Sequence, residues 1–340
     1  MCSGCLNHII IITLNSILII QTAFIGDVIL ATPLIEKLHQ NYPEAAIDFL
    51  LRKGNEGLLK GHPYLRNVLI WDKKKAKYSH LLAIVKSIRS EHYDYVINLQ
   101  RFLTTGIITV FSGADQTIGF SKNPLSFFFT RRFPHLIDTA NNKVHEVDRN
   151  LLLIRGIVDN TEQMRPQLYP REEDFEKVKY DEDYVTISPT SVWFTKQYPL
   201  EKWVEVINII NPNYTVCLLG GKADAEACEW IKSQSAHPRI MVMAGLLSFL
   251  ASAALMKNAV MNYVNDSAPL HLASATNAPV TAIFCSTIPA FGFGPLSINS
   301  RIVETTEKLD CRPCGLHGYK ACPKKHFKCA DIPPERIVNS

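Results

Sequence analysis

The sequence lacks the glycine-rich signatures with which many nucleotide-binding proteins hold phosphate groups. Neither GxGxxG nor GxxxxGKS/T follows any apolar run, and both motifs exist to bring backbone amides close to phosphate. Their absence argues against a dinucleotide-binding dehydrogenase and against a P-loop NTPase. Any phosphate that the protein binds must be held by other loops and helix termini.

An excess of charge of one sign and a dense set of cysteines are missing as well. The 36 Lys and Arg against 32 Asp and Glu leave a net charge of only +4. This balance does not indicate nucleic acid as a partner, but it suits an anionic small molecule or membrane surface. Nine cysteines in 340 residues are too few for a disulfide scaffold, so we expect a reducing compartment.

No apolar run has the length of a membrane span. Residues 9–20 are strongly apolar, but polar side chains such as Thr13 interrupt the run, no Lys or Arg precedes it, and no small-residue cleavage site follows it. The run is also shorter than the roughly 20 residues that cross a bilayer. We interpret residues 16–21 as a buried strand, preceded by an extension, residues 1–15, to which the sequence assigns no role.

Length and periodicity predict two α/β domains. One hydrophobic core stops growing at roughly 250 to 300 residues, and short apolar runs alternate with amphipathic helical patterns in two successive series. We predict an N-terminal domain over residues 1–160, a charged, proline-containing linker over 161–183, and a C-terminal domain over 184–340. Such sheets bind ligands at the carboxyl ends of their strands, so we expect a cleft between the domains.

The expected elements follow the same pattern in both halves. The predicted strands are 16–21, 46–51, 67–71, 93–99, 184–188, 214–219, 239–243, 259–264 and 279–284. The predicted helices are 33–40, 80–91, 200–210, 223–233, 247–256 and 269–276.

A Gly-Asp pair follows the first predicted strand. Gly26 permits a tight turn, and Asp27 stands where a helix should begin. Asp is a common N-cap, so one interpretation is a structural cap. The other is a general base, since a carboxylate at the end of a strand faces the cleft and can take a proton from a substrate hydroxyl. Pro33 lies too far along for the first turn of a helix that begins at Asp27, which predicts a late start or a kink.

Two loops of the second half are suited to anions. The first combines hydroxyls with a lysine, and the second opens a helix that Asn265 or Asp266 can cap, with amides and dipole directed at a phosphate. The alternatives are an ordinary polar loop with an exposed lysine and a buried core histidine. Together the loops predict a nucleoside diphosphate site. The candidate residues are Ser188, Thr190, Ser191, Lys196, Asp266, Ser267, Ala268 and His271.

Two further segments bear on metals and on the acceptor. Four cysteines, Cys311, Cys314, Cys322 and Cys329, cluster in a basic loop over residues 311–329, where a structural zinc site competes with free thiols or conditional disulfides. The only Asp-x-Asp triplet, Asp181 to Asp183, lies in the charged linker and is interpreted as solvated surface. Aromatic and basic residues in NPLSFFFTRRF suit an amphiphilic partner.

Four segments in this order resemble those of the ADP-heptose:lipopolysaccharide heptosyltransferases, glycosyltransferase family 9. They are QTAFIGDVILATP, SPTSVWFTKQYP, NDSAPLHLASA and CRPCGLHGYKACPKKHFKC, and the resemblance extends from about Ser16 to Ala330. It implies a GT-B architecture, two Rossmann-like domains facing across a cleft. It also implies an inverting transfer from ADP-heptose, without metal or cofactor, to the inner core and lipid A of lipopolysaccharide, by a cytoplasmic protein in peripheral contact with the inner membrane.

The resemblance also assigns roles to single residues. It implies that Asp27 is the base, that Lys196 contacts donor phosphate, and that Asp266, Ser267 and His271 bind the ADP moiety. Ala268 stands where the family usually has glycine, and Asp224 is the candidate for an acidic residue that family members use after an LLGG strand. Two other functions stay open at this point: a GT-B-type nucleotide-sugar epimerase and a non-catalytic zinc-binding assembly protein.

Overall fold

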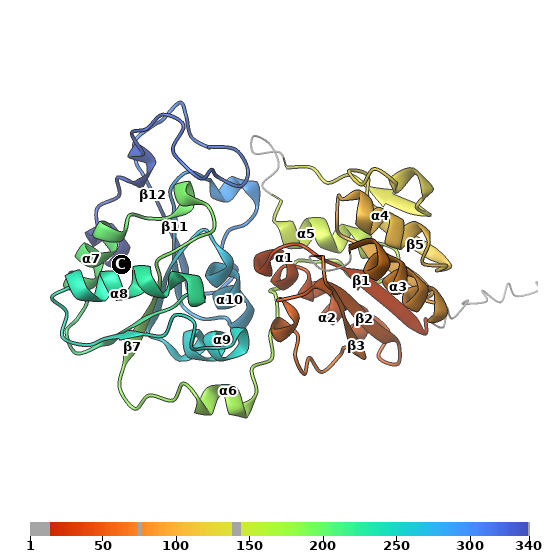
Figure 1. Cartoon of the computed structure of the whole chain (residues 1–340), viewed down its shortest axis with the longest axis horizontal. Coiled ribbons are helices and arrows are strands. Elements are labelled where there is room, and N and C mark those ends of the chain that lie inside the picture. The colour runs from red at the N-terminus through yellow and green to blue at the C-terminus, as the bar shows by residue number, and fades with distance from the viewer. Residues whose placement is uncertain (1–13, 74–76, 138–143, 339–340) are drawn as a thin grey trace, which may run out of the picture.

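Two six-stranded sheets, each built of parallel strands, form the two lobes of the protein (Figure 1). The computed structural model describes residues 14–73, 77–137 and 144–338, so residues 1–13 of the N-terminal extension considered above lie outside the described residues. The sheet orders are β3-β2-β1-β4-β5-β6 and β12-β11-β10-β7-β8-β9. When the strands of each lobe are numbered from one, both sheets have the order 3-2-1-4-5-6 of the doubly wound dinucleotide-binding fold. The predicted α/β class is confirmed.

The first lobe contains the N-terminal series of elements. Its strands are β1 (Ser16–Ile20), β2 (Ala46–Arg52), β3 (Asn67–Trp71), β4 (Tyr95–Asn98), β5 (Gln116–Phe120) and β6 (Arg131–Phe133). Its helices are α1 (Ile25–Ile29), α2 (Thr32–Asn41), α3 (Lys77–Ser90), α4 (Leu103–Val110) and α5 (Glu146–Leu151).

The second lobe repeats the pattern. Its strands are β7 (Tyr184–Ser188), β8 (Thr215–Leu218), β9 (Ile240–Val242), β10 (Met261–Asn265), β11 (Val280–Phe284) and β12 (Ser300–Glu304). Its helices are α7 (Leu200–Ile209), α8 (Ala225–Gln234), α9 (Phe249–Asn258), α10 (Ala268–Thr276) and α11 (Glu335–Val338), and α6 (Glu172–Glu176) lies in the connection between the lobes.

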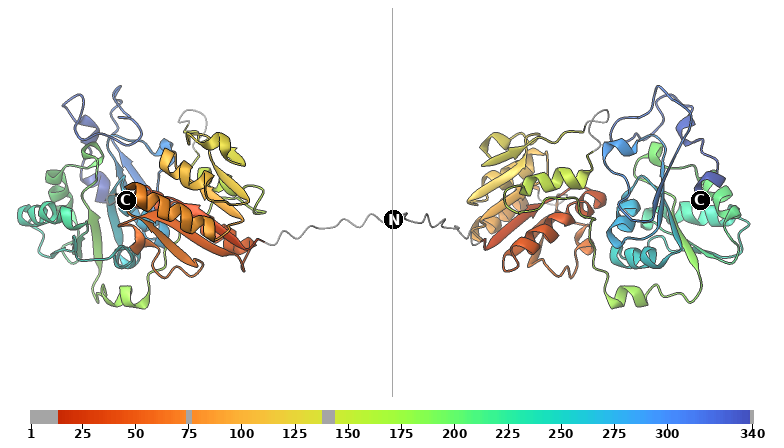
Figure 2. Two further views of the ribbon diagram at one scale, coloured as in Figure 1. Left: turned by 45° about the vertical axis from the view of Figure 1, so that its right-hand side comes forward. Right: turned by 180° about the vertical axis from the view of Figure 1, so that it is seen from behind.

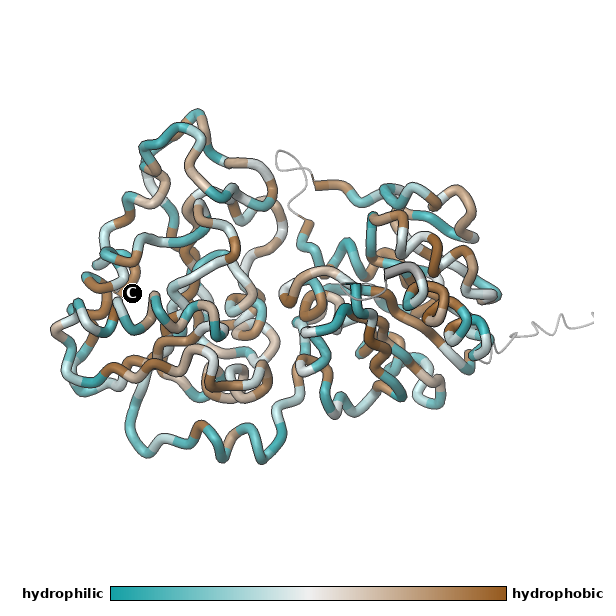
Figure 3. Tube along the Cα trace, in the orientation of Figure 1, coloured by the Kyte–Doolittle hydropathy of each residue, from teal (hydrophilic) through white to brown (hydrophobic). Residues whose placement is uncertain are grey.

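The central strands form as they do because both of their faces are covered. Residues 17–20 of β1 are fully buried, which is why this strand reads as an unbroken apolar run rather than an alternating one. Figure 3 shows apolar stretches on the strands and inward helices of both lobes, with hydrophilic residues on the connecting loops. Strands β5, β6 and β12 were not predicted from the sequence; β6 and β12 are edge strands with few buried positions.

The two lobes meet along α1 and α2, which follow β1 in the first lobe, and α9 and α10, which flank β10 in the second. One hydrophobic cluster runs without interruption from α1 and α2 into α9 and α10, and Figures 1 and 2 show α1 and α10 at the junction. The carboxyl ends of β1 and β4 therefore face those of β7 and β10. Within the described ranges, no helix is both long and apolar enough to cross a membrane.

Candidate active site

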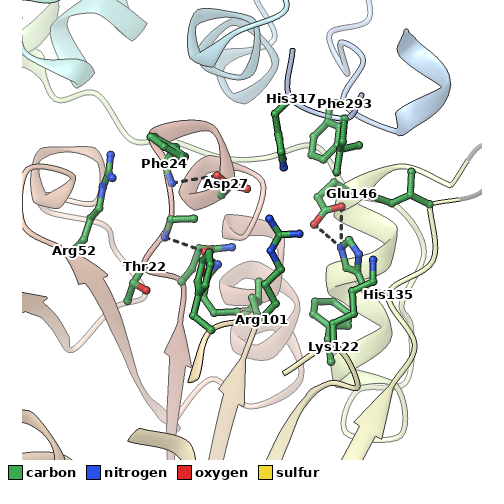
Figure 4. Close-up of a pocket in the computed structure, with 18 of the residues that line it drawn as sticks. Thr22, Phe24, Asp27, Arg52, Arg101, Lys122, His135, Glu146, Phe293 and His317 are labelled. Carbon is green, nitrogen blue, oxygen red and sulfur yellow. Dashed lines mark hydrogen bonds and ion pairs between the residues drawn. The ribbon is translucent and has the colours of Figure 1, made fainter. Parts of the chain in front are cut away.

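A cavity of about 330 Å³ opens where the carboxyl ends of β1 and β4 meet the second lobe (Figure 4). Asp27 and Glu146 line it from the first lobe, and Phe293 and His317 line it from the second. Four cationic side chains also line it: Arg52, Lys73, Arg101 and Lys122. The site thus combines two carboxylates, several positive charges and aromatic walls.

Asp27 is positioned by a short helix that follows β1. Phe24 is the N-cap of α1, and its amide donates to Asp27 Oδ2 at 3.1 Å, so the carboxylate stabilises the helix start from within the first turn. Helix α1 ends after residue 29, and α2 restarts at Thr32 with Pro33 in its first turn, where a missing amide costs little. The predicted interruption is confirmed. The cap and base interpretations of Asp27 are compatible, since the same carboxylate lines the cavity.

The surroundings of Asp27 make it a stronger base than an ordinary aspartate. Burial, and after it the negative charge of Glu146, raise its pKa from 3.8 to about 6, against the lowering effects of backbone amides and Arg52. A carboxylate with such a pKa is ionised near neutral pH and still accepts a proton readily.

Glu146 is a second acidic residue of the site, which the sequence analysis missed. Its carboxylate accepts from His135 Nε2 at 3.0 Å and from Arg149 Nε at 2.7 Å. Burial raises its pKa, but these two partners outweigh burial and hold the pKa below its ordinary value. The local sequence HEVDR contains the partner Arg149 but gave no signal that Glu146 lines the cavity, because Asp27 and His135 come from other segments of the chain.

The four cations leave the cavity positively charged. Lys73 Nζ donates to Thr22 O and Oγ1 at 2.9 and 3.0 Å, and burial, with the charge of Arg52, lowers its pKa to about 8. The Arg52 guanidinium lies 4.7 Å from the Phe24 ring centroid. Among the residues that the structure describes, neither Arg52, Arg101 nor Lys122 forms an ion pair with a carboxylate. These charges are therefore available to an anionic ligand.

Lys196 and Asp266 come together at the facing edge of the second lobe. Lys196 Nζ lies 2.7 Å from Asp266 Oδ2, and the same oxygen accepts from Thr287 Oγ1 at 2.6 Å. The prediction that Asn265 or Asp266 caps α10 is wrong. Ser267 is the N-cap, because Asn265 ends β10 and the Asp266 side chain turns toward Lys196.

The other predicted residues of this edge differ in exposure. Ser188, at the end of β7, is only 2% exposed, whereas Thr190 and Ser191 are partly exposed in the loop that follows. Asn265 fixes this loop, since its amide nitrogen donates to Pro189 O at 2.9 Å. Ala268 is the first residue of α10, so the helix starts two residues after Asp266, the ion-pair partner of Lys196.

His271 and Asp224 have structural partners of their own. The buried His271 imidazole packs against Gly26 of the first lobe, where an added Cβ would lie 2.8 Å from His271 Cδ2. Burial, together with the charges of His145 and Lys196, lowers the pKa of His271 to about 3, so the ring is neutral. Asp224 follows β8 and accepts from the Gly221 amide at 2.8 Å, within its own loop.

The four clustered cysteines line a second cavity of about 160 Å³, together with His326. Cys311 Sγ lies 3.8 Å from His326 Nε2. Burial raises the pKa of Cys329 to about 11. Burial also acts to raise the pKa of Cys322, but hydrogen bonds from the backbone amides of residues 324–327 together outweigh it and lower that pKa. No three His, Cys, Asp or Glu side chains of the described residues are placed to hold a metal. The zinc site stays a prediction.

Comparison with known proteins identifies the family. The profile of glycosyltransferase family 9 (heptosyltransferase) matches residues 81–319, which is more than half of the chain. The protein therefore belongs to this family and is a glycosyltransferase, as the sequence resemblance implied.

Individual relatives agree with this assignment. The chain is 28% identical to lipopolysaccharide heptosyltransferase 3 of Escherichia coli over 278 residues, 78% of this chain and 82% of the relative. The fold is similar to that of the family 9 glycosyltransferase from Veillonella parvula DSM 2008, with a TM-score of 0.80, 21% identity and 96% of each chain covered. The ADP-heptose lipopolysaccharide heptosyltransferase II of E. coli gives a TM-score of 0.76 at 21% identity, covering 95% of this chain and 96% of that one. The GT-B architecture is confirmed.

Proposed function

We propose that the protein transfers a heptose from ADP-heptose to the inner core of lipopolysaccharide, with inversion at the anomeric carbon and without a metal ion. The observation that carries the proposal is the place of Asp27: a basic carboxylate in a cavity that lies between the lobes and is lined by both. The names of the similar E. coli proteins, a lipopolysaccharide heptosyltransferase and an ADP-heptose heptosyltransferase, support this donor and acceptor.

The second lobe supplies the donor site in this proposal. The side chain of the N-cap Ser267 does not cap α10. Pro269 has no amide hydrogen and the Leu270 amide donates to Ser267 O at 3.0 Å, so the Ala268 amide and the helix dipole favour a negative charge here, as does the ammonium of Lys196. The hydroxyls of Thr190 and Ser191 lie on the loop that carries Lys196. These groups would bind the diphosphate and stabilise the charge that develops on it as ADP departs. Ser188 and Asp224 would act through the shape of their loops.

The first lobe supplies the acceptor site. Its cavity offers Arg52, Arg101 and Lys122 to anionic groups and the exposed ring of Phe102 to the apolar face of a sugar. Acceptors that carry carboxylate or phosphate groups on a sugar have this chemistry. The inner core of lipopolysaccharide, next to lipid A, fits it.

The reaction follows from the position of Asp27. The acceptor hydroxyl oxygen attacks the anomeric carbon of the heptose from the face opposite ADP, while Asp27 takes the hydroxyl proton. The bond from the anomeric carbon to the β-phosphate oxygen breaks, and its electron pair leaves with ADP. One displacement of this kind inverts the configuration. Lys196 takes the electrostatic role that a divalent metal would otherwise serve.

Peripheral membrane contact belongs to the same proposal. Phe127 and Phe128 are 62% and 61% exposed, with ring centroids 4.1 Å apart, and Lys122 and Arg132 nearby in sequence are exposed as well. Exposed aromatics beside cations suit the interface of an anionic bilayer. The acceptor is amphiphilic, so an enzyme at the cytoplasmic face of the membrane would meet it there.

The test is the substitution Asp27→Asn, which keeps an oxygen to accept from the Phe24 amide but removes the base. Incubation with ADP-heptose and truncated lipopolysaccharide, read by mass spectrometry, should show transfer reduced by roughly 10²- to 10⁴-fold. ADP binding measured by calorimetry should be unchanged. Turnover close to that of the parent would refute the assigned base. Conversion of ADP-heptose in the absence of acceptor would instead identify an epimerase.

A further inference from the structure

We infer that Glu146 is a positioning residue that acts on Asp27 through space, as a fixed negative charge on the opposite wall of the cavity, and that both lobes hold it there. The inference rests on the proposed function, in which Asp27 is the base. Figure 4 shows the two carboxylates on facing sides of the cavity, with His317 reaching in from the second lobe.

The Glu146 carboxylate is held by side chains of the first lobe. It belongs to the first residue of α5, its side chain is 12% exposed, and both of its oxygens accept from His135, at 3.0 and 3.2 Å. Arg149, one turn along α5, donates to it at 2.7 Å. A carboxylate with two such donors stays ionised and keeps one orientation.

The start of α5 is in turn tied to the second lobe. The Glu146 amide donates to Gly292 O at 2.8 Å, and Arg149 Nη2 donates to Phe291 O at 2.7 Å. His145 Nε2 lies 3.1 Å from Gly294 O. Gly292 has φ +89°, and a Cβ there would overlap the Val144 carbonyl and the Arg149 guanidinium. The close approach therefore requires glycine.

Because Glu146 lines the same cavity as Asp27, its negative charge acts on the ionisation of Asp27 as well as on its own ion-pair partners. A second negative charge in the same low-dielectric cavity disfavours the ionised form of Asp27, and so makes it a better proton acceptor. Because the contact with residues 291–294 fixes the start of α5, the effect is greatest when the lobes are together. The other titratable and charged groups that line the cavity are Arg52, Lys73, Arg101, Lys122, His135 and His317, and His145 and His271 lie at its lobe interface.

The experiment is a comparison of pH profiles of kcat/KM for transfer. Glu146→Gln removes the charge at constant size, and Glu146→Asp keeps the charge. We expect the acidic limb of the Gln variant to move to lower pH by roughly half a unit, which raises the ionised fraction of Asp27 at pH 5 about two- to threefold. The plateau rate should fall, because the base is weaker. The Asp variant should keep the limb of the parent.

Two further variants separate this effect from a merely structural one. Gly292→Ala opens the contact between α5 and the second lobe without altering any cavity side chain, and we expect it to move the limb in the same direction as Glu146→Gln. His135→Gln keeps a donor to Glu146 without a titrating ring, so the limb should persist.

An unchanged limb in Glu146→Gln, with only a lower rate, would overturn the inference and leave Glu146 a structural residue. A limb that disappears in His135→Gln would also overturn it. Should Glu146→Gln fail to fold, Gly292→Ala gives the same test. Failure of the proposed function is distinguishable, because it would appear as full activity of Asp27→Asn.

Discussion

Gly26 of α1 and His271 of α10 are in direct contact across the two lobes, with no space between them for a methyl group. The residue before Asp27 is glycine because α10 approaches α1 at this point. The Asp27 backbone is thus one residue from the lobe junction, so a displacement of α10 acts on the turn that carries Asp27.

Gly26→Ala should destabilise the protein and impair transfer. A Cβ at this position would lie 2.8 Å from His271 Cδ2, and overpacking of this kind costs about 1 to 3 kcal/mol. Urea unfolding and the transfer assay measure the two effects. Adding His271→Ala removes the obstacle, so the double variant should recover part of the loss. Additive losses in the double variant would show that the contact is not the cause.

The rate of transfer should depend on the ionisation of Asp27. Its pKa is raised to about 6 by burial and by Glu146, and only the ionised form accepts a proton. We expect kcat/KM to rise with pH through about 6 and then to level off. A profile without a limb between pH 5 and 7 would contradict this assignment.

The same pKa affects stability in the opposite sense. The folded pKa of Asp27, about 6, exceeds its ordinary value of 3.8, so the folded state holds the proton more tightly. The resulting stabilisation is present below about pH 4 and is lost as pH rises through about 6. Asp27→Asn does not titrate, and its unfolding free energy should exceed that of the parent by about 1 to 2 kcal/mol at pH 7.5, with the excess gone at pH 4. Thermal or urea unfolding at both pH values measures the difference.

Lys196→Ala should weaken ADP binding and reduce transfer by roughly 10²- to 10³-fold, because it removes the cation expected at the departing diphosphate. Lys202→Ala is a matched control: Lys202 lies on α7 and pairs at 3.4 Å with the exposed Asp331.

An excess of EDTA should leave turnover unchanged. A loss of activity that added divalent metal restores would refute metal-independent transfer.

Replacement of Phe127 and Phe128 by Ser should reduce binding to vesicles that contain anionic phosphatidylglycerol. Both rings are mostly exposed, so stability should change little. Sedimentation with vesicles at low and high salt measures the effect, and phosphatidylcholine vesicles are the control. Equal binding of parent and variant would assign the membrane contact to another surface.

The four segments that carry the family resemblance and the pattern of strands were predictable, because each depends only on residues that are neighbours in the sequence. Strand β7 (Tyr184–Ser188) has the predicted bounds, since a strand buried on both faces is a short apolar run between polar loops. The interruption before Pro33 was predictable for the same reason: a proline ring constrains its own turn. By contrast, Asp266 was expected to cap α10 because it stands beside the helix start, but Lys196, 70 positions earlier, pulls its side chain away.

The α/β class, the two-lobed organisation and the place of Asp27 after the first strand follow from local patterns, because apolar periodicity and turn residues act over a few neighbouring positions. The charges that surround that aspartate depend instead on how distant segments pack. Glu146, His135 and the cavity cations come from segments far apart in the chain, and no local pattern encodes their distances. The pairing of Gly292 with the start of α5 likewise depends on how the two lobes pack.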